Sequence, residues 1–341
     1  MGISTRSTAA RPLTESGLEH VTASVRTHLA EVEDRIAAQA AAFDPSIEGY
    51  VTFALGSRGK RLRPLLALLS GGATGAITSK HVDLAVVVEL IHVATLVHDD
   101  IIDEAERRRS QPTVNARWGN ALSVLLGDSL FAHALDLSTN FDNPAVSRAV
   151  ARSAREVCSG EILQTQRRFD LHLAIDEYLR IIRMKTAALF GCACEIGALL
   201  NDAPAPIGAA LKQFGLRLGT AYQIYDDCVD LAGDEGKTGK TLGTDLRKGK
   251  LTLPILIMLR STPEAERERC SELILKGDAD EITRRLRSGA GGGPLRESIA
   301  TARVLVAEAE AQLEALPANS ETETLRALAN SIRELLAQLR G

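Results

Sequence analysis

The chain has 341 residues, of which 45% are hydrophobic, and its 40 basic and 44 acidic side chains leave a net charge of −4. This apolar content is enough for a real core, which excludes an intrinsically disordered chain. The near balance of charge leaves no basic surface for nucleic acid and gives no reason for tight binding to an anionic membrane.

Aromatic residues make up 4% of the chain and alternating β-branched residues are rare, which is typical of helices packed on helices. Gly and Pro residues divide the chain into helical segments. The predicted helices cover residues 15–42, 46–55, 61–70, 80–103, 118–139, 144–168, 175–201, 206–232, 252–260, 263–275, 295–315 and 319–339.

The breaks between these segments are short, and no repeat of fixed period connects them. The sequence therefore predicts an all-α fold as a single large domain over residues 1–341, rather than two domains joined by a linker. Residues 1–14 are expected to be flexible. The more charged part, residues 260–341, is expected to form amphipathic outer helices.

The location of the protein is predicted from its apolar segments and its cysteines. Residues 82–97 and 251–259 are the longest apolar stretches, and both fall short of the roughly 18–20 residues that span a bilayer. The N-terminal segment has no apolar run of the secretory type. Five scattered cysteines without a CxxC spacing predict reduced thiols. We therefore expect a soluble cytoplasmic protein.

The most informative segment is residues 82–103, an apolar helix with a polar stripe. The stripe contains Glu89, His92, Asp99 and Asp103, which fall on one face at helical spacing. Asp99 and Asp103 are one turn apart, with Asp100 beside them, and like charges at this spacing repel. Hard oxygen ligands this close suit Mg²⁺ shared with phosphate oxygens.

A second acidic motif of the same DDxxD form follows 127 residues later. It consists of Asp226, Asp227 and Asp230, preceded by Gln223, on another apolar helix. A solvated acidic helix end would explain one such motif. Two copies, each followed by basic residues, instead favour two carboxylate clusters that face each other across the interior of a helical bundle, where metal sites are built.

Basic residues accompany both motifs. They are Lys60, Arg61 and Arg63 in the loop GSRGKRLRP, Arg107, Arg108 and Arg109 after the first motif, Lys185 with Thr186 in a further helix, and Lys237, Lys240, Arg247, Lys248 and Lys250 after the second. For Arg61, Arg107, Lys237 and Lys248 a solvated surface is the preferred interpretation. The set as a whole predicts a cavity with Mg²⁺ and enough cations for two polyphosphate groups.

With these motifs the chain resembles the trans-isoprenyl diphosphate synthases of the long-chain polyprenyl type. The resemblance covers residues 50–256 and includes GSRGKRLRP, LLGDSLFA, GEILQTQ, MKTAALFG and both aspartate motifs in family order. Tyr222 departs from it, because phenylalanine is usual there. The resemblance implies a bundle of antiparallel helices around a central cavity, a homodimer, and Mg²⁺ as cofactor.

The resemblance also implies a role for each site residue. Asp99, Asp103, Lys185 and Asp226 would carry catalysis. Lys60, Arg63, His92 and Arg109 would hold the diphosphate of isopentenyl diphosphate, and Arg108, Lys185, Thr186, Gln223, Lys240 and Lys250 the allylic diphosphate. The metal ligands would come from Asp99, Asp100, Asp103, Asp226, Asp227 and Asp230.

Chain length is predicted from the turn before Asp99. Ala94 and Thr95 are small there, whereas in the family bulky aromatic residues at these positions stop growth early. A long-chain product is therefore favoured over a geranylgeranyl or farnesyl length, with Phe131 as an alternative floor. Its polyprenyl tail would also bring peripheral membrane contact.

Two readings of another kind remain. A class I terpene cyclase shares the aspartates and Mg²⁺, but it has no need of a second diphosphate site such as Lys60 and Arg63 would form. A non-catalytic subunit of a heteromeric synthase would be expected to lack one aspartate motif, and both are intact.

Overall fold

We analysed a computed structural model of the chain, which describes residues 22–56, 59–108, 111–233, 242–288 and 293–339. Helices dominate it, with one two-stranded hairpin of β1 and β2 among the described residues. The longer elements are α2 (Arg26–Ala38), α3 (Glu48–Leu55), α4 (Leu62–Thr74), α5 (Ser79–Ile102), α7 (Asn120–Thr139), α8 (Pro144–Gln166), α9 (Ile175–Ile182), α10 (Ala188–Leu199), α11 (Ala205–Ala232), α14 (Leu253–Ser261), α15 (Glu264–Leu275), α16 (Ala279–Ser288), α17 (Gly293–Gln312) and α18 (Ser320–Gln338). The shorter ones are η1 (Ala23–Val25), η2 (Gln39–Ala42), β1 (Arg107–Arg108), β2 (Gln111–Pro112), α6 (Val114–Trp118), η3 (Arg183–Ala187), α13 (Thr244–Arg247) and η4 (Leu313–Ala315).

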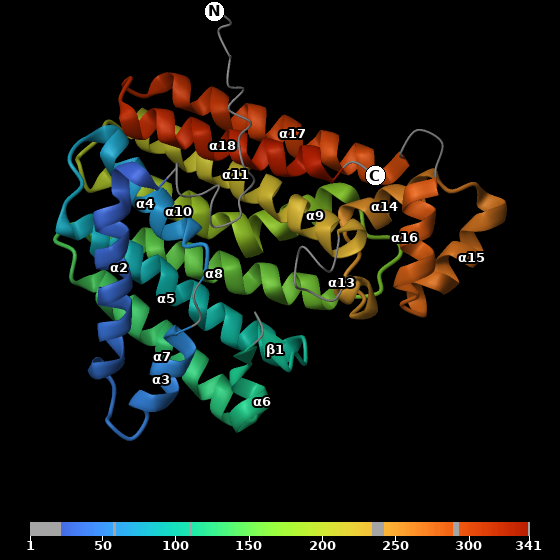
Figure 1. Cartoon of the computed structure of the whole chain (residues 1–341), viewed down its shortest axis with the longest axis horizontal. Helices are drawn as coiled ribbons and strands as arrows, with labels where there is room; N and C mark the ends of the chain where they lie inside the picture. The colour runs from blue at the N-terminus through green and yellow to red at the C-terminus, as the bar shows by residue number, and fades with distance from the viewer. Residues whose placement is uncertain (1–21, 57–58, 109–110, 234–241, 289–292, 340–341) are drawn as a thin grey trace, which may run out of the picture.

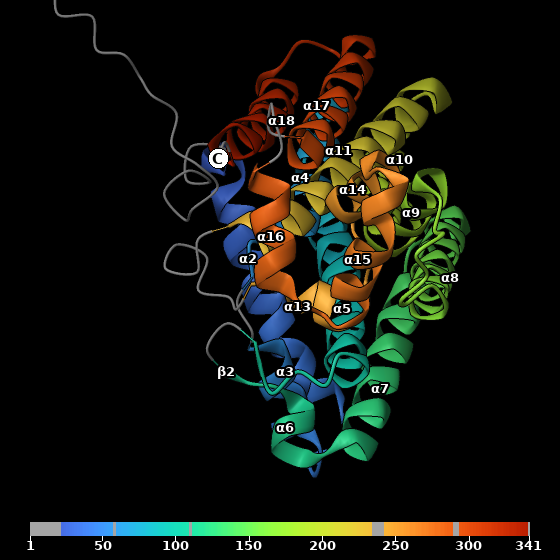
Figure 2. The ribbon, with the colours of Figure 1, turned by 90° about the vertical axis from the view of Figure 1, so that its right-hand side faces the viewer.

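The helices form a bundle around α5, α10 and α11. Helix α10 packs between α4 and α11, while α5 packs against α4 and α7. Helices α17 and α18 lie along one side of the bundle, over α11 and α4, and α15 and α16 gather at one end (Figures 1 and 2). One hydrophobic core extends from Val25 to Leu336. The predicted all-α fold is thus confirmed.

The helices differ from the sequence prediction in two ways: α13 and α16 lie outside every predicted helix, and two predicted helices are interrupted. The predicted helix over residues 118–139 is broken at Gly119 into α6 and α7. The predicted helix over residues 175–201 is interrupted by η3, a π-helical turn between α9 and α10. Such a turn shifts the face that the following residues present, and periodicity in the sequence does not reveal it because the flanking residues remain helical.

Helix α7 is apolar but only partly covered by the rest of the described structure. By length and composition it could cross a membrane, and it is the one such helix among the described residues. Of that window 33% is buried. Val124 is 43% and Leu125 67% exposed. Within the described part of the chain, this apolar helix face is therefore left partly uncovered.

Helix α5 begins at a buried histidine. The Nδ1 atom of His81 accepts from the backbone N–H of Thr78 at 3.1 Å, and its Nε2 lies 3.1 Å from the carbonyl oxygen of Gly197 in α10. These partners assign the neutral ring with the proton on Nε2. Burial lowers the pKa of His81 below its ordinary value. The fold therefore requires an uncharged imidazole here.

We expect this histidine to make the protein sensitive to acid. The folded state binds the proton less readily than the unfolded chain does. The free energy of unfolding should therefore decrease as the pH is lowered from about 7.5 to about 5.5. Urea unfolding at the two values should show a smaller fall in His81→Gln than in the wild type. His172→Gln, at an exposed position, should leave the pH dependence unchanged. An identical fall in all three proteins would contradict the expectation.

Candidate functional site

The first acidic motif lies at the C-terminal end of α5, where two cations hold its last aspartate. Asp103 accepts hydrogen bonds from Nζ of Lys250 at 2.7 Å and from Nη2 of Arg168 at 2.9 Å, one on each carboxylate oxygen. Burial would raise the pKa of Asp103, but Lys250 and neighbouring lysines hold it below the ordinary value. Asp103 is therefore ionised and charge-compensated.

Lys185 approaches the first aspartate of the same motif from the π-helical turn. Its Nζ lies 3.7 Å from Oδ2 of Asp99, donates to Oε1 of Gln164 at 2.9 Å and pairs with Glu161. Although burial would lower it, the pKa of Lys185 is raised by these carboxylates. The approach depends on Gly160 of α8, because a Cβ there would lie 2.5 Å from the backbone nitrogen of Lys185.

The middle aspartate of the motif faces another way. Asp100 is buried and accepts from Nε and Nη2 of Arg108 at 3.0 and 2.8 Å. Burial raises the pKa of Asp100, and the positive charge of Arg108 offsets part of this rise. Asp100 thus anchors the β1–β2 hairpin to α5, whereas Asp99 and Asp103 share the face that meets Lys185 and Lys250.

The second acidic motif lies on α11, and its middle aspartate is held by neutral donors. Asp227 is buried and accepts from the hydroxyl of Tyr178 at 2.5 Å and from Nε2 of Gln223 at 2.8 Å. The hydroxyl of Thr186 in turn donates to Oε1 of Gln223 at 2.8 Å. Burial raises the pKa of Asp227. This chain of hydrogen bonds joins α9, η3 and α11.

The last aspartate of the second motif caps a short helix. Asp230 accepts from the hydroxyl and N–H of Thr244 at 2.7 and 3.2 Å and from the N–H of Asp245 at 3.1 Å, at the start of α13. Burial raises the pKa of Asp245, repulsion from Asp230 adds to this rise, and the half-buried Asp226 contributes further repulsion. Acidic residues are therefore concentrated along this end of α11.

The two motifs are linked by a lysine. Nζ of Lys250 contacts Asp103 of the first motif and also lies 3.7 Å from Oδ1 of Asp245, which is hydrogen-bonded to the second motif. The adjacent residues Lys185 and Thr186 make a second link, because one contacts Asp99 and the other Gln223. Both acidic helix ends thus line one region of the bundle.

The basic segment that leads into α4 lies against α10 and α11. Nζ of Lys60 lies 3.4 Å from the hydroxyl of Tyr222 and 5.7 Å from its ring centroid. The guanidinium of Arg63 stacks 4.8 Å from the ring centroid of Phe190. Burial lowers the pKa of Arg63, and the nearby Glu89 and Tyr222 offset part of this decrease. The tyrosine that departs from the family pattern therefore supplies a hydroxyl to this basic segment.

The interpretation of Arg61 as a solvated residue is wrong. Its side chain is 9% exposed, and it forms ion pairs with Glu33 at 2.5 Å and with Glu89 at 2.6 Å. Glu89 is buried, so the first residue of the predicted polar stripe serves this ion pair. Arg61 also has a left-handed backbone, with φ of 49°. Its partners lie 28 residues away on either side, which helical spacing does not reveal.

The remaining predicted site residues differ in how far they are exposed to solvent. Arg107 is exposed, as expected. Lys248 is half-buried and helps to lower the pKa of Asp103, so it serves the first motif as well as the surface. His92 is half-buried on α5. Arg109, Lys237 and Lys240 lie outside the described residues.

The donor set fits a divalent cation that is shared with a ligand. Within the described ranges no three His, Cys, Asp or Glu side chains converge to hold a metal by themselves. Mg²⁺ is commonly held by one or two carboxylates while water and substrate phosphates complete its shell. Asp99 and Asp103 supply such a pair. Lys185 and Lys250, which face them, balance the negative charge of the two carboxylates.

Sequence reasoning missed four residues of this region, each from a segment outside the motifs. They are Glu161 beside Lys185, Arg168 beside Asp103, Tyr178 beside Asp227 and Asp245 beside Asp230. Glu161 lies in the quoted segment GEILQTQ, which was a usable signal. The other three carry no local pattern.

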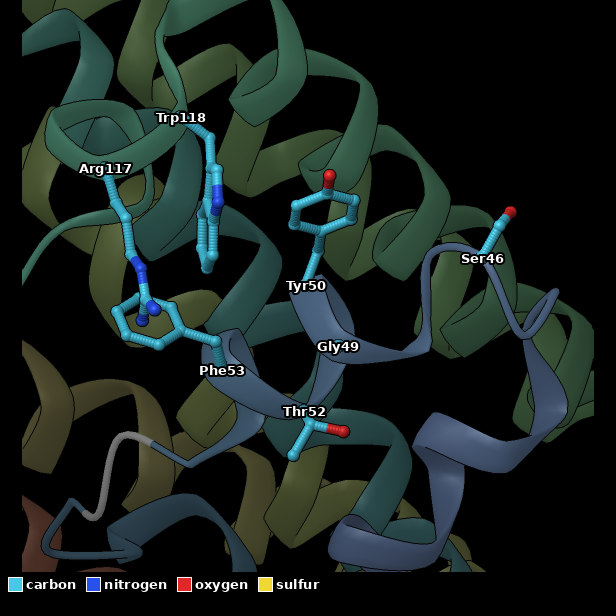
Figure 3. Close-up of a pocket in the computed structure, with 7 residues that line it drawn as sticks. All are labelled: Ser46, Gly49, Tyr50, Thr52, Phe53, Arg117 and Trp118. Atoms are coloured by element: carbon cyan, nitrogen blue, oxygen red, sulfur yellow. The ribbon is translucent and has the colours of Figure 1, made fainter.

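A separate hollow of about 430 Å³ opens between α3 and α6 and contains none of the predicted site residues (Figure 3). Arg117 stacks there at 4.9 Å from Phe53 and 4.6 Å from Trp118, measured to the ring centroids. Tyr50 meets Trp118 edge to face at 5.0 Å. Because no residue of either acidic motif lines it, this hollow is distinct from the acidic region.

The chain is similar to known proteins over most of its length. The family model described as polyprenyl synthetase matches residues 44–286. Heptaprenyl diphosphate synthase component 2 of Geobacillus stearothermophilus is 43% identical over 203 residues, which cover 59% of this chain and 63% of that protein. This alignment therefore spans less than two thirds of that relative.

Two solved structures cover nearly the whole chain. A decaprenyl diphosphate synthase from Rhodobacter capsulatus is 34% identical, with a TM-score of 0.86 over 95% of this chain and 99% of that one. A polyprenyl synthase from Caulobacter crescentus, complexed with calcium and isoprenyl diphosphate, is also 34% identical, with a TM-score of 0.85 over 93% and 97%. The fold and the long-chain resemblance predicted from the sequence are confirmed.

Proposed function

The chain belongs to the polyprenyl synthetase family, and from this premise we propose that it condenses isopentenyl diphosphate with an allylic diphosphate into a long all-trans polyprenyl diphosphate. Among its relatives are enzymes named for heptaprenyl and decaprenyl products. The observation that carries the proposal is the convergence of Asp99, Asp103, Lys185 and Lys250 from different elements on one region.

The residues of this chain would act by binding and charge neutralisation. Lys185 and Lys250 would hold the allylic diphosphate, and Lys60 with Arg63 would hold that of isopentenyl diphosphate. As the allylic C–O bond breaks, negative charge grows on the departing diphosphate, and these fixed cations stabilise it. The double bond of isopentenyl diphosphate then attacks the allylic cation, and a proton is lost to the departed diphosphate. Buried apolar helices exclude the water that would quench the cation.

We propose that the divalent cation is Mg²⁺, held by Asp99 and Asp103 on α5 and by Asp226 on α11. When bound, it would neutralise diphosphate oxygens as a Lewis acid. Asp100, Asp227 and Asp230 have other partners in the structure, so their role would be to position the ligands around them. The calcium-bound relative supports the use of a divalent cation.

The proposal is tested with the purified full chain. It should convert isopentenyl diphosphate and a short allylic primer into a long polyprenyl diphosphate when Mg²⁺ is present, and chromatography of the products gives their length. Loss of activity with a chelating agent and its return with Mg²⁺ would establish the metal requirement. No product with any allylic primer would contradict the proposal.

The length of the product provides a sharper prediction. Ala94 is fully buried on α5, five residues before Asp99. We expect Ala94→Phe to shorten the product because a bulky ring there blocks the path of the growing chain. Thermal unfolding should accompany the assay, since overpacking a core position costs about 1–3 kcal/mol. If the product of a folded Ala94→Phe is unchanged while Phe131→Ala lengthens it, the floor lies at Phe131 instead.

We further propose that two copies pair through the exposed apolar face of α7, which includes Val124 and Leu125. Burying these side chains against a second copy would remove apolar area from water. Leu125→Asp should shift the sedimentation coefficient from dimer to monomer, whereas Val304→Asp, at an exposed apolar position on α17, provides a charge control away from this face. A dimer that persists in Leu125→Asp would place the interface elsewhere.

A second candidate is the catalytic subunit of a heteromeric synthase, favoured by the name component 2 of one relative. Full activity of the purified chain alone would contradict it. We also propose that residues 1–341 form one domain in the cytoplasm. The continuous core supports the first part, and the five unpaired cysteines, four of them buried, support the second.

A further inference from the structure

An arginine from the turn after α8 reaches into the first acidic motif. Nη2 of Arg168 donates to Oδ1 of Asp103 at 2.9 Å and lies 3.4 Å from the carbonyl oxygen of Ile102. Lys250 takes the other carboxylate oxygen at 2.7 Å. The side chains are 23%, 17% and 9% exposed for Arg168, Asp103 and Lys250, so water screens this triad only partly.

The turn that carries this arginine is held in a strained shape. Phe169 has a left-handed backbone with φ of 61°, which costs energy for any residue with a side chain. Its N–H donates to the carbonyl oxygen of Gly249 at 2.8 Å, and its ring covers that glycine so closely that a Cβ there would lie 2.5 Å away. The turn is therefore locked to the segment that presents Lys250, and the two cations are placed together around Asp103.

The position of the Arg168 guanidinium leaves one of its hydrogen-bond donors unsatisfied. Nε of Arg168 is buried and has no partner within the part of the chain that the structure describes. An unsatisfied buried donor is unfavourable, so the attraction to Asp103 outweighs this loss. Arg167, one residue earlier, contrasts with it: it is more exposed and pairs with Glu177 at 2.8 Å and Asp170 at 3.3 Å, away from the motif.

From these contacts we propose that Arg168 is a positioning residue that neutralises Asp103 in the metal-free protein and competes there with the divalent cation. The inference rests on the proposed function, because Asp103 is taken as a ligand of that cation. A guanidinium within hydrogen-bond distance of a carboxylate repels a divalent ion bound to the same group. Removing the arginine charge should thus tighten metal binding, whereas loss of a merely structural contact would weaken it.

The test measures Mn²⁺ binding to the full-length chain by calorimetry or electron paramagnetic resonance, without any diphosphate. Arg168→Gln should bind Mn²⁺ about tenfold more tightly than the wild type, as expected for one removed positive charge in a partly screened site. Arg168→Lys, which keeps the charge, should bind as the wild type does. Arg167→Gln is the matched control and should also leave the affinity unchanged. The metal-free melting temperature of Arg168→Gln should fall, and Mn²⁺ should raise it by more than in the wild type.

Each outcome decides the matter. Equal or weaker Mn²⁺ binding by Arg168→Gln, with normal binding by the wild type, would overturn the competition while leaving the proposed function intact. Equally tightened binding in Arg168→Lys would overturn it as well, because the charge would not be responsible. If the wild type binds no Mn²⁺ at millimolar concentration, this inference fails, whereas the metal assignment, in which substrate phosphates complete the shell, is still tested by the Mg²⁺ dependence of product formation. Arg168→Met serves as a second neutral variant should the glutamine variant be poorly folded.

Discussion

Asp99→Ala is expected to leave a folded protein whose turnover falls by about three orders of magnitude, the scale of losing a charge-stabilising element of the transition state. Asp99 is half-buried on α5, 3.7 Å from Lys185, and supplies one carboxylate of the turn-spaced pair. Lys185 keeps Glu161 and Gln164 as partners in the variant, so the core should tolerate the change.

The measurement is the rate of product formation at saturating Mg²⁺ and both substrates, with circular dichroism to establish the fold. Asp83→Ala is the matched control, because Asp83 is an exposed aspartate on the same helix that pairs with Arg35 far from the motif. This control should retain the wild-type rate. A near-normal rate for Asp99→Ala would remove the first motif from catalysis and with it the proposed site.

Arg61→Ala is expected to destabilise the fold strongly. Its guanidinium is buried between Glu33 and Glu89, and Glu89 is itself 3% exposed. Removing one partner of a buried ion pair leaves an uncompensated charge and costs about 3–5 kcal/mol. We expect the lower end of that range, about 3 kcal/mol, because Glu33 is partly exposed and can turn to water. Consistent with the pairing, both carboxylates raise the pKa of Arg61 above its ordinary value, although burial alone would lower it.

Urea unfolding of the wild type and of Arg61→Ala measures the change in the free energy of unfolding directly. Arg107→Ala, at an exposed arginine, should change the free energy of unfolding by at most about 0.5 kcal/mol. Adding Glu89→Gln to Arg61→Ala should recover part of the loss because it removes the buried charge. If Arg61→Ala is as stable as Arg107→Ala, the buried triad contributes nothing to the fold.

The fold class and the two acidic motifs could be read from the sequence because both depend on local spacing. An apolar face that repeats every three or four residues specifies α5 and α11 as buried helices wherever they pack. Aspartates one turn apart then share a face by helical geometry alone, as Asp99 and Asp103 do. The break at η3 could not be read in this way, since a π-helical turn changes the hydrogen-bond pattern without changing the apolar pattern.

The partners of these aspartates depend on contacts between distant segments. Lys250 lies 147 residues from Asp103, Arg168 lies 65 residues from it, and Tyr178 lies 49 residues from Asp227. No periodicity connects such pairs, so the sequence could predict that cations surround the site but not which cation holds which carboxylate. The same limit explains Arg61, whose position among basic residues suggested solvent until the packing of α2 and α5 enclosed it.

The sequence by itself thus determined that the chain is helical and carries two turn-spaced carboxylate pairs, because helix periodicity and motif spacing act over a few residues, and the prenyl-synthase type followed from the resemblance of its motifs. The tertiary structure alone decided that Asp100, Asp227 and Asp230 turn toward Arg108, Tyr178 and Thr244, while Asp99 and Asp103 meet lysines and an arginine. The physical reason is that buried charges must find partners where the packed helices place them, and that placement is a property of the whole bundle.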